Sequence, residues 1–185
     1  FLGQNFAKAS GIKFVSRSNT QELAWTTSWG VSTRLIGTVI MAHGDDDGVI
    51  LPPRIAPAQV IIIPVTPKEE TRAAVLDAAK QLANRLQAQS FHGHPIRVEI
   101  DQRDIGGGTK SWEWIKKGVP VRIEIGPRDL EKGTVALARR DASPKEKSFP
   151  TADEAVATIA STLQSIHDTL LARATCLLYT SPSPR

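Results

Sequence analysis

The spacing of apolar positions predicts short strands and one helix in the first part of the chain. Apolar residues cluster over 12–15 and 23–29, which indicates strands, whereas residues 2–9 fit a strand or a helix equally well. A helix is expected over 32–42, followed by a turn at 45–48. The apolar residues of this helix share one face at three- and four-residue spacing: Leu35, Ile36, Val39 and Ile40.

The second part, from about residue 57, has a stronger pattern. Residues 59–65 form a continuous apolar run, typical of a strand that is buried on both faces of a sheet. Further along, Val121 and Ile123 alternate with Arg122 and Glu124, which places the two charged side chains on the polar face of a strand. Three further strands are expected over 96–101, 119–125 and 134–140, and three helices over 67–89, 112–117 and 151–174.

The order of these elements predicts the fold class. A strand, a helix, a strand, a short helix, two strands and a helix follow one another, which predicts a mixed sheet flanked by helices, an α/β domain. Pro52, Pro53 and Pro57 interrupt the chain between the two parts, because proline lacks an amide donor and disfavours helix. We therefore expect one domain to end at residue 56 and a second to span 57–174.

Composition narrows the class of protein. Apolar residues make up 41% of the chain, so a packed core can form and wholesale disorder is excluded. The formal net charge of +4 suits a partner with phosphates without requiring one. Cys176 is the single cysteine, which excludes an internal disulfide and favours the reducing cytoplasm. No apolar run approaches the roughly 20 residues of a membrane helix, so no membrane partner is expected.

Both ends of the chain have unusual features. The chain begins at Phe1 without an initiator methionine, and we interpret it as part of a longer protein. After Ala174 the helical pattern stops, and the single cysteine and the single tyrosine both follow. We interpret residues 175–185 as a non-native tail; a flexible natural terminus is the alternative.

The junction between the last strand and the helix of the first part is a candidate ligand site. Gly30 allows a ligand to approach the backbone closely. Arg34 falls in the first helical turn, where backbone amides and the helix dipole favour anions, and a guanidinium binds phosphate through two hydrogen bonds. The alternative is that Arg34 lies on a solvated helix face and that Trp29 is a core residue.

Other polar clusters are weaker candidates. An acidic turn such as 45–47 is usually exposed to solvent, and the pair His92 and His94 has no further ligand nearby in the sequence. The glycine-rich segment 106–110 lacks the spacing of a phosphate-binding loop. We therefore predict no metal site.

A series of motifs along the chain resembles one enzyme family. The chain is similar over residues 1–174 to the C-terminal region of prolyl-tRNA synthetases, in the form shared by archaea, eukaryotes and some bacteria. The similar segments follow one another in a single order: 1–9, 27–34, 43–46, 48–53, 56–60 and 118–129.

The resemblance implies an activity, cofactors and partners. This family activates proline with ATP and Mg²⁺ and transfers it to proline tRNA, as a homodimer. It implies that 1–56 end a class II catalytic domain, built on an antiparallel sheet and including motif 3, and that 57–174 form an anticodon-binding domain. The family's motif 1 and its motif 2 arginine have no counterpart in this sequence, so we expect the chain alone to be inactive. By matching positions, the implied ATP-binding residues are Gln4, Thr27 and Arg34, with Arg34 also catalytic, and the implied proline-binding residues are Ser28, Trp29 and Gly30.

The resemblance also implies an anticodon-reading region. Proline anticodons share two guanines, and guanine needs both a cation and a carboxylate to be recognised on its edges. Arg122 and Asp129 match the family best, and the further candidates are Arg128, Lys117, Lys116 and Glu113. This chain departs from the family by having Ile115 in place of a base-reading glutamate and Ser111 in place of an aromatic residue. One guanine contact must then be made differently, with Glu113 as one candidate, or be weaker. The alternative for Arg122 is an ordinary surface pair with Glu124.

Two other functions compete with this interpretation. A non-catalytic RNA-binding module with the same fold would have no use for the 27–34 segment. Another class II synthetase, such as the threonyl or histidyl enzyme, fits the 27–30 and 44–46 segments less well.

Overall fold

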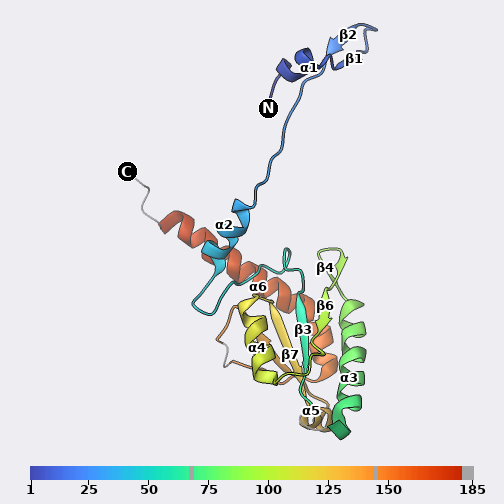
Figure 1. Ribbon diagram of the computed structural model, residues 1–185, viewed down its shortest axis with the longest axis vertical. Helices are drawn as coiled ribbons and strands as arrows, with labels where there is room; N and C mark the ends of the chain where they lie inside the picture. Colours follow the sequence, from blue (N-terminus) through green and yellow to red (C-terminus); the bar gives the residue numbers. More distant parts are fainter. Residues whose placement is uncertain (67–68, 144–145, 181–185) are drawn as a thin grey trace. The chain divides into compact units, whose positions relative to one another are not determined.

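The computed structural model describes residues 1–66, 69–143 and 146–180. The chain divides into two compact units, 1–37 and 38–185 (Figure 1). The packing division therefore precedes the proline-rich stretch, and the domain boundary at residue 56 stays a prediction.

The first unit contains a short helix and a hairpin. Helix α1 (Asn5–Ser10) ends at Gly11 in the left-handed conformation, which settles the open assignment of 2–9 as helix. Strands β1 (Lys13–Val15) and β2 (Gln21–Leu23) pair antiparallel, so the first predicted strand is confirmed. The hairpin is the only sheet among residues 1–37, and the larger antiparallel sheet stays a prediction.

The predicted strand over 23–29 is wrong. Strand β2 ends at Leu23, and beyond it the segment forms only an isolated bridge between Gly3 and Thr26. Trp25 and Trp29 are exposed, and Trp25 stacks on Phe1 with the ring centres 5.6 Å apart, so the apolar residues that suggested a strand here do not belong to a buried core.

Helix α2 (Arg34–His43) begins two residues later than predicted, and its apolar face is largely exposed. The turn after it is confirmed, because Asp45 and Gly48 form an antiparallel bridge.

The second unit is built on a four-stranded mixed sheet, as predicted. Strands β3 (Val60–Pro64), β6 (Val98–Ile100) and β7 (Val121–Ile125) are parallel, and β8 (Ala136–Arg139) is antiparallel to β7. The order in the sheet is β6-β3-β7-β8, and every residue of β3 is buried. A small hairpin of β4 (Ser90–Phe91) and β5 (His94–Pro95) precedes β6.

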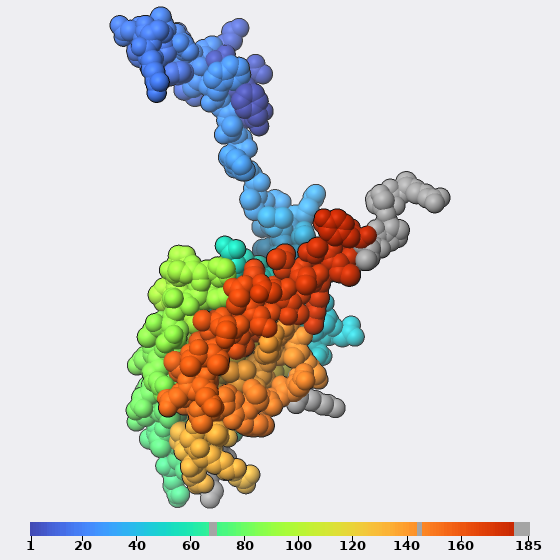
Figure 2. Space-filling model, turned by 180° about the vertical axis from the view of Figure 1, so that it is seen from behind, coloured from blue at the N-terminus to red at the C-terminus, as the bar shows by residue number. Residues whose placement is uncertain are grey.

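Helices cover both faces of this sheet. Helices α3 (Glu69–Gln87) and α6 (Ala152–Thr180) pack on the face that carries Val60 and Ile62, and together they enclose the main core. Helix α4 (Gly107–Lys116) lies over the opposite face, where Trp114 packs against a second cluster around Ile61 and Ile63. Figure 1 shows α3 and α4 on opposite sides of the sheet, and Figure 2 shows α6 lying across the other side of the unit beside α3.

Several helix boundaries differ from the prediction. Helix α6 begins with the capping box of Thr151 and Glu154, whose side chains each accept the other's backbone amide. It runs to Thr180 rather than ending near Ala174, so the predicted end of the helix is wrong. The origin of 175–185 stays a prediction, and residues 181–185 lie outside the described residues, as do residues 67 and 68 at the predicted start of α3.

A short helix between β7 and β8 was not predicted. Helix α5 (Pro127–Lys132) starts with proline, whose missing amide costs nothing in the first turn. The side chain of Asp129 accepts the Gly126 amide at 2.8 Å and so caps this helix.

Within the second unit, hydrogen bonds to its backbone hold the segment before β3 against the rest of the unit. The Leu51 amide donates to Gly118 O at 3.0 Å, and the Gln59 side-chain amide donates to Pro53 O at 2.9 Å. Arg97 Nε donates to Ala56 O at 3.0 Å. Within the described ranges, no helix is long and apolar enough to cross a membrane.

Candidate nucleic-acid interface

Two adjoining hollows lie where β3 and β7 end, beside α4 and α5. The larger has a volume of about 740 Å³ and the smaller about 430 Å³. Val65, Glu124 and Lys147 line both hollows and therefore form their common wall. Ligands of open α/β sheets characteristically bind beyond the carboxyl ends of parallel strands, which is where these hollows lie.

The common wall holds an ordered ion pair. Lys147 Nζ donates to one carboxylate oxygen of Glu124 at 2.7 Å, and Ser111 Oγ of α4 donates to the other at 3.3 Å. Residue 124 lies opposite Ala136 in the sheet, and the small alanine side chain leaves room for the larger hollow. The side chains of Glu124 and Lys147 remain 21% and 33% exposed, so solvent and ligands can reach the pair.

Each hollow also has one exposed aromatic ring. Trp112 lines the smaller hollow and Phe149 the larger. The segment with Phe149 is held against β8, because Leu137 and Ser148 exchange both backbone hydrogen bonds at 2.9 Å. Exposed rings of this kind stack on unpaired bases.

The predicted residues Arg128 and Asp129 line the larger hollow. Arg128 is exposed, whereas Asp129 is half-buried at the start of α5. The structure thus brings these two predicted residues to one site.

Arg122 does not lie on an accessible polar face. The predicted alternation is confirmed, but α4 covers that face and Arg122 is only 2% exposed. Its Nε is buried and has no hydrogen-bond partner within the part of the chain that the structure describes. Burial lowers the pKa of the Arg122 guanidinium, Glu124 raises it, and Arg140 lowers it further. The alternative of a surface pair with Glu124 is wrong, because Glu124 pairs with Lys147.

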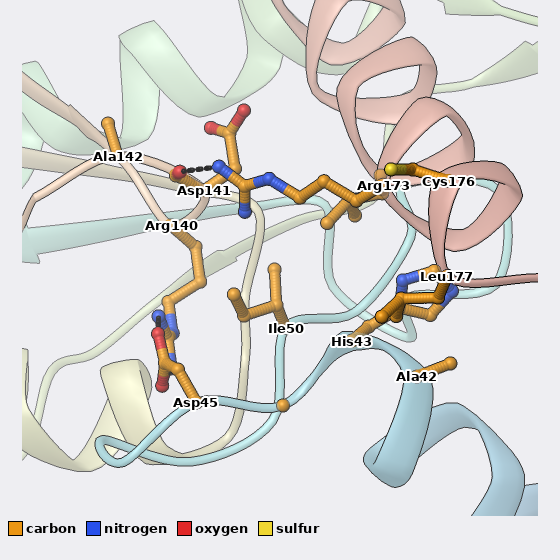
Figure 3. Close-up of a pocket in the computed structure, with 12 residues that line it drawn as sticks. Ala42, His43, Asp45, Ile50, Arg140, Asp141, Ala142, Arg173, Cys176 and Leu177 are labelled. Carbon is orange, nitrogen blue, oxygen red and sulfur yellow. Dashed lines mark hydrogen bonds and ion pairs between the residues drawn. The ribbon is translucent and has the colours of Figure 1, made fainter. Parts of the chain in front are cut away.

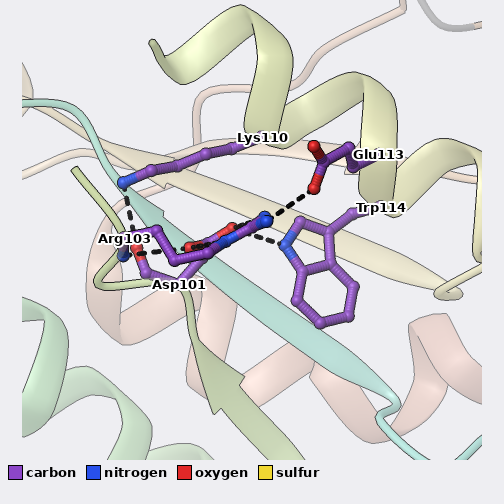
Figure 4. A network of polar contacts seen from close by, with 5 residues as sticks. All are labelled: Asp101, Arg103, Lys110, Glu113 and Trp114. Atoms are coloured by element: carbon purple, nitrogen blue, oxygen red, sulfur yellow. Dashed lines mark hydrogen bonds and ion pairs between the residues drawn. The ribbon is translucent and has the colours of Figure 1, made fainter. Parts of the chain in front are cut away.

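Glu113 belongs to a different cluster, which fixes α4 to the end of β6 (Figure 4). Its carboxylate accepts a hydrogen bond from Arg103 at 2.7 Å, and Arg103 also binds Asp101 at 2.7 Å. Trp114 Nε1 donates to Asp101 at 2.8 Å, and buried Lys110 donates to Asp101 O at 3.1 Å. Hydrogen bonds from Arg103 and then Trp114 hold the pKa of the Asp101 carboxyl well below its usual range.

This arrangement separates Glu113 from the hollows. Glu113 is not among the residues that line either hollow, whereas Ile115 lines the smaller one. Lys116 and Lys117 lie at the end of α4, where their ammonium groups stand 5.4 Å and 4.2 Å from the ring centres of Trp112 and Trp114.

The predicted residues of the first part lie along one segment with little regular structure. The Gln4 side-chain amide donates to Leu23 O at 2.8 Å and so joins α1 to β2. Arg34 is the first residue of α2. The others are exposed and lie outside helices and strands: Thr27, Ser28, Trp29 and Gly30. Their roles toward ATP and proline stay predictions.

Sequence reasoning missed three residues of the interface. Glu124 was recognised only as part of an alternation, and Lys147 and Phe149 fall in a stretch without periodicity. Only the pairing of residue 148 with β8 brings these two side chains to the hollows. Among the described residues there is no cluster of three or more histidine, cysteine or acidic side chains that could hold a metal ion.

The mixed α/β fold thus carries, beyond the ends of its parallel strands, two hollows that are lined by aromatic side chains and by charges of both signs. Residues 59–162 match the family model described as "Anticodon binding domain", and the chain belongs to this family. The chain is 64% identical to a proline–tRNA ligase of Akkermansia muciniphila, over 94% of this chain and 34% of the relative. It is 58% identical to proline–tRNA ligase 2 of Anaeromyxobacter dehalogenans, over 94% of this chain and 34% of the relative. It is 55% identical to the proline–tRNA ligase of Bdellovibrio bacteriovorus, over 94% of this chain and 35% of the relative. The chain therefore spans about a third of the length of these relatives.

These three relatives are bacterial. The narrower assignment to the form shared with archaea and eukaryotes stays a prediction.

Proposed function

We propose that the chain is the part of a proline–tRNA ligase that includes its anticodon-binding domain. One observation carries the proposal: the similarity to proline–tRNA ligases covers 94% of the chain and so extends beyond residues 59–162. A free-standing RNA-binding module would need similarity only over that domain. The whole ligase on this proposal is a cytoplasmic homodimer that joins proline to its tRNA, and this chain alone is inactive.

The second unit, on this proposal, binds the unpaired anticodon bases in the two hollows. Trp112 and Phe149 offer stacking surfaces, and Arg128, Lys116 and Lys117 offer cations for phosphates. Since phosphate contacts position RNA and edge contacts specify it, the polar groups of the hollows would supply the specificity.

The first part would contribute to the ATP and proline sites. Helix α2 begins at Arg34 with no acidic residue in its first turn, which suits an anionic ligand. Gln4 and Thr27 would assist Arg34 in holding ATP, and 28–30 would contact proline. When bound, ATP with its Mg²⁺ supplies the phosphoanhydride whose cleavage activates the proline carboxylate. The role of Arg34 would be to hold phosphate and neutralise its charge.

The first test is RNA binding by the unmutated 185-residue chain. Proline tRNA should bind more tightly than a transcript with both anticodon guanines replaced, by about 1–3 kcal/mol for each lost base contact. Fluorescence anisotropy at physiological salt measures both affinities. Lys116→Ala should weaken both RNAs alike and flatten the salt dependence, because it removes a phosphate contact. Equal affinity of the unmutated chain for the two RNAs would refute anticodon reading.

The second test concerns Arg34 in the full-length ligase. Arg34→Ala should slow proline-dependent exchange of pyrophosphate into ATP by about a hundredfold, the usual cost of losing a charged contact in the transition state. Affinity for tRNA should not change. Arg17→Ala, in the exposed turn of the β1–β2 hairpin, is the matched loss of charge and should leave exchange intact. Near-normal exchange by Arg34→Ala would contradict the ATP-binding role.

A further inference from the structure

We propose that Glu124 and Lys147 form the guanine-reading pair of the smaller hollow. Glu124 accepts hydrogen bonds from the N1 and N2 donors of the base, and Lys147 donates to its O6 or N7. This inference rests on the proposed function, because it specifies how one anticodon guanine is recognised.

The composition of the smaller hollow carries the assignment. Among its described lining residues, Glu124 is the only acidic side chain and Lys147 the only basic one. The remaining wall is neutral: Val65, Gly107, Gly108, Ser111, Trp112 and Ile115. A base stacked on Trp112 in this hollow would therefore find its charged donor and acceptor in this one pair.

The chemistry of the pair selects guanine. The O6 and N7 atoms of guanine accept hydrogen bonds, and its N1 and N2 groups donate them. An adjacent ammonium and carboxylate complement this pattern, whereas adenine presents an acceptor at N1 and an amino donor in place of O6. Lys147 Nζ and the Glu124 carboxylate lie 2.7 Å apart, so one planar base edge can span both groups.

The other carboxylates near the hollows are less suited to this position. Asp129 and Glu131 line only the larger hollow, and one oxygen of Asp129 caps α5 through the Gly126 amide at 2.8 Å. Glu113 is bound by Arg103.

Little free energy is needed to separate the side chains of Glu124 and Lys147. Both side chains are partly exposed to solvent, so water and an entering base can replace the contact between them. The hydrogen bond from Ser111 Oγ keeps the carboxylate in place when Lys147 moves to the base. The free protein thus holds both groups close to the positions in which they act.

The experiment uses the full 185-residue chain and anticodon stem-loop RNAs of proline tRNA. Each anticodon guanine is replaced in turn by inosine, which lacks the N2 amino group but keeps O6, N1–H and N7. For the unmutated chain we expect about a tenfold loss of affinity at the guanine bound in the smaller hollow, the size of one charged base contact. Glu124→Gln should reduce the guanine-over-inosine preference at that position to about twofold or less.

The ratio of two affinities is the decisive readout. Glu124→Gln removes a negative charge and strengthens binding of both RNAs, but this effect cancels in the ratio. Glu99→Gln, at an exposed position of β6 outside both hollows, makes the same change of charge and should keep the tenfold preference. Glu124→Asp keeps the charge and should retain part of the preference, and circular dichroism verifies that each variant is folded.

The outcomes separate the two proposals. A Glu124→Gln variant that keeps the unmutated preference at both positions would overturn the assignment of Glu124 while leaving anticodon reading intact. If the unmutated chain shows no preference for proline anticodon loops over loops with both guanines replaced, both proposals are overturned.

Discussion

Replacing Gly118 by alanine is expected to lower the free energy of unfolding by about 3–5 kcal/mol, as strain and overpacking combine. Gly118 follows α4 with a φ of 74°, a conformation that costs a residue with a side chain about 1–2 kcal/mol. A Cβ atom at this position would also lie 2.4 Å from Val49 O and 2.8 Å from Val49 Cγ1. Because the nearest atom belongs to the backbone, the segment around residue 49 would have to move away from α4.

Gly133 offers a matched control. Its φ is 65°, but no atom of the described residues lies within 4 Å of an added Cβ, so Gly133→Ala should cost only about 1–2 kcal/mol from the backbone conformation. Urea unfolding of both variants measures the difference. Equal losses for the two variants would show that the close approach at Gly118 contributes nothing.

The second large effect is expected at the ion pair between Asp45 and Arg140. Arg140 is buried, and its Nη atoms donate to the two carboxylate oxygens of Asp45 at 2.6 Å and 2.7 Å (Figure 3). Its Nε donates to Ile115 O at 3.0 Å. Asp45→Asn would leave a buried cation without its counter-charge and should lower the free energy of unfolding by about 3 kcal/mol. This value is at the lower end of the range for breaking buried ion pairs, because the Asp45 side chain is 42% exposed.

The same pair predicts how stability depends on pH. The hydrogen bond from Arg140 is the main cause that lowers the pKa of Asp45 in the folded state. A carboxyl whose pKa is lower in the folded state stabilises the protein above its unfolded pKa of about 3.9, and this contribution is lost as the pH falls below that value. The difference in unfolding free energy between the unmutated chain and Asp45→Asn should therefore be large at pH 7 and shrink at pH 3.

Asp46→Asn is the control, since Asp46 is exposed in the same turn. It removes the same charge and should change stability little at either pH. A difference for Asp45→Asn that stays constant between pH 7 and pH 3 would contradict the proposed origin of the effect.

The sheet and its main helices could be predicted because apolar spacing records which residues face the core. The apolar run 59–65, which contains the buried strand β3, and the inward face of α6 illustrate this. Arg122 shows the limit: alternation identifies the residues that share a face, but not whether another element covers that face. Helix α4 covers it, and a side chain assigned to an open surface is therefore buried.

Other differences between the predictions and the structure have separate causes. Helix α5 has one turn and no apolar periodicity, although Pro127 and Asp129 carried a capping signal. The site residues Lys147 and Phe149 depend on a non-local pairing with β8, which no local pattern records. The contact of Glu113 with Arg103 could not be predicted from sequence, because it requires α4 to be placed beside the end of β6.

The docked segment before β3 also determines where this domain can be exchanged between related enzymes. A chimaera joined at Gln59, where the family match begins, would inherit a foreign stretch opposite Arg140 and Gly118. Three partners would then have to be reproduced by the donor sequence: the carboxylate of Asp45, the close backbone at Val49 and the Pro53 carbonyl. A junction near Gly37 keeps all of these contacts within one parent, so modular recombination should tolerate that site better than the border of the family match.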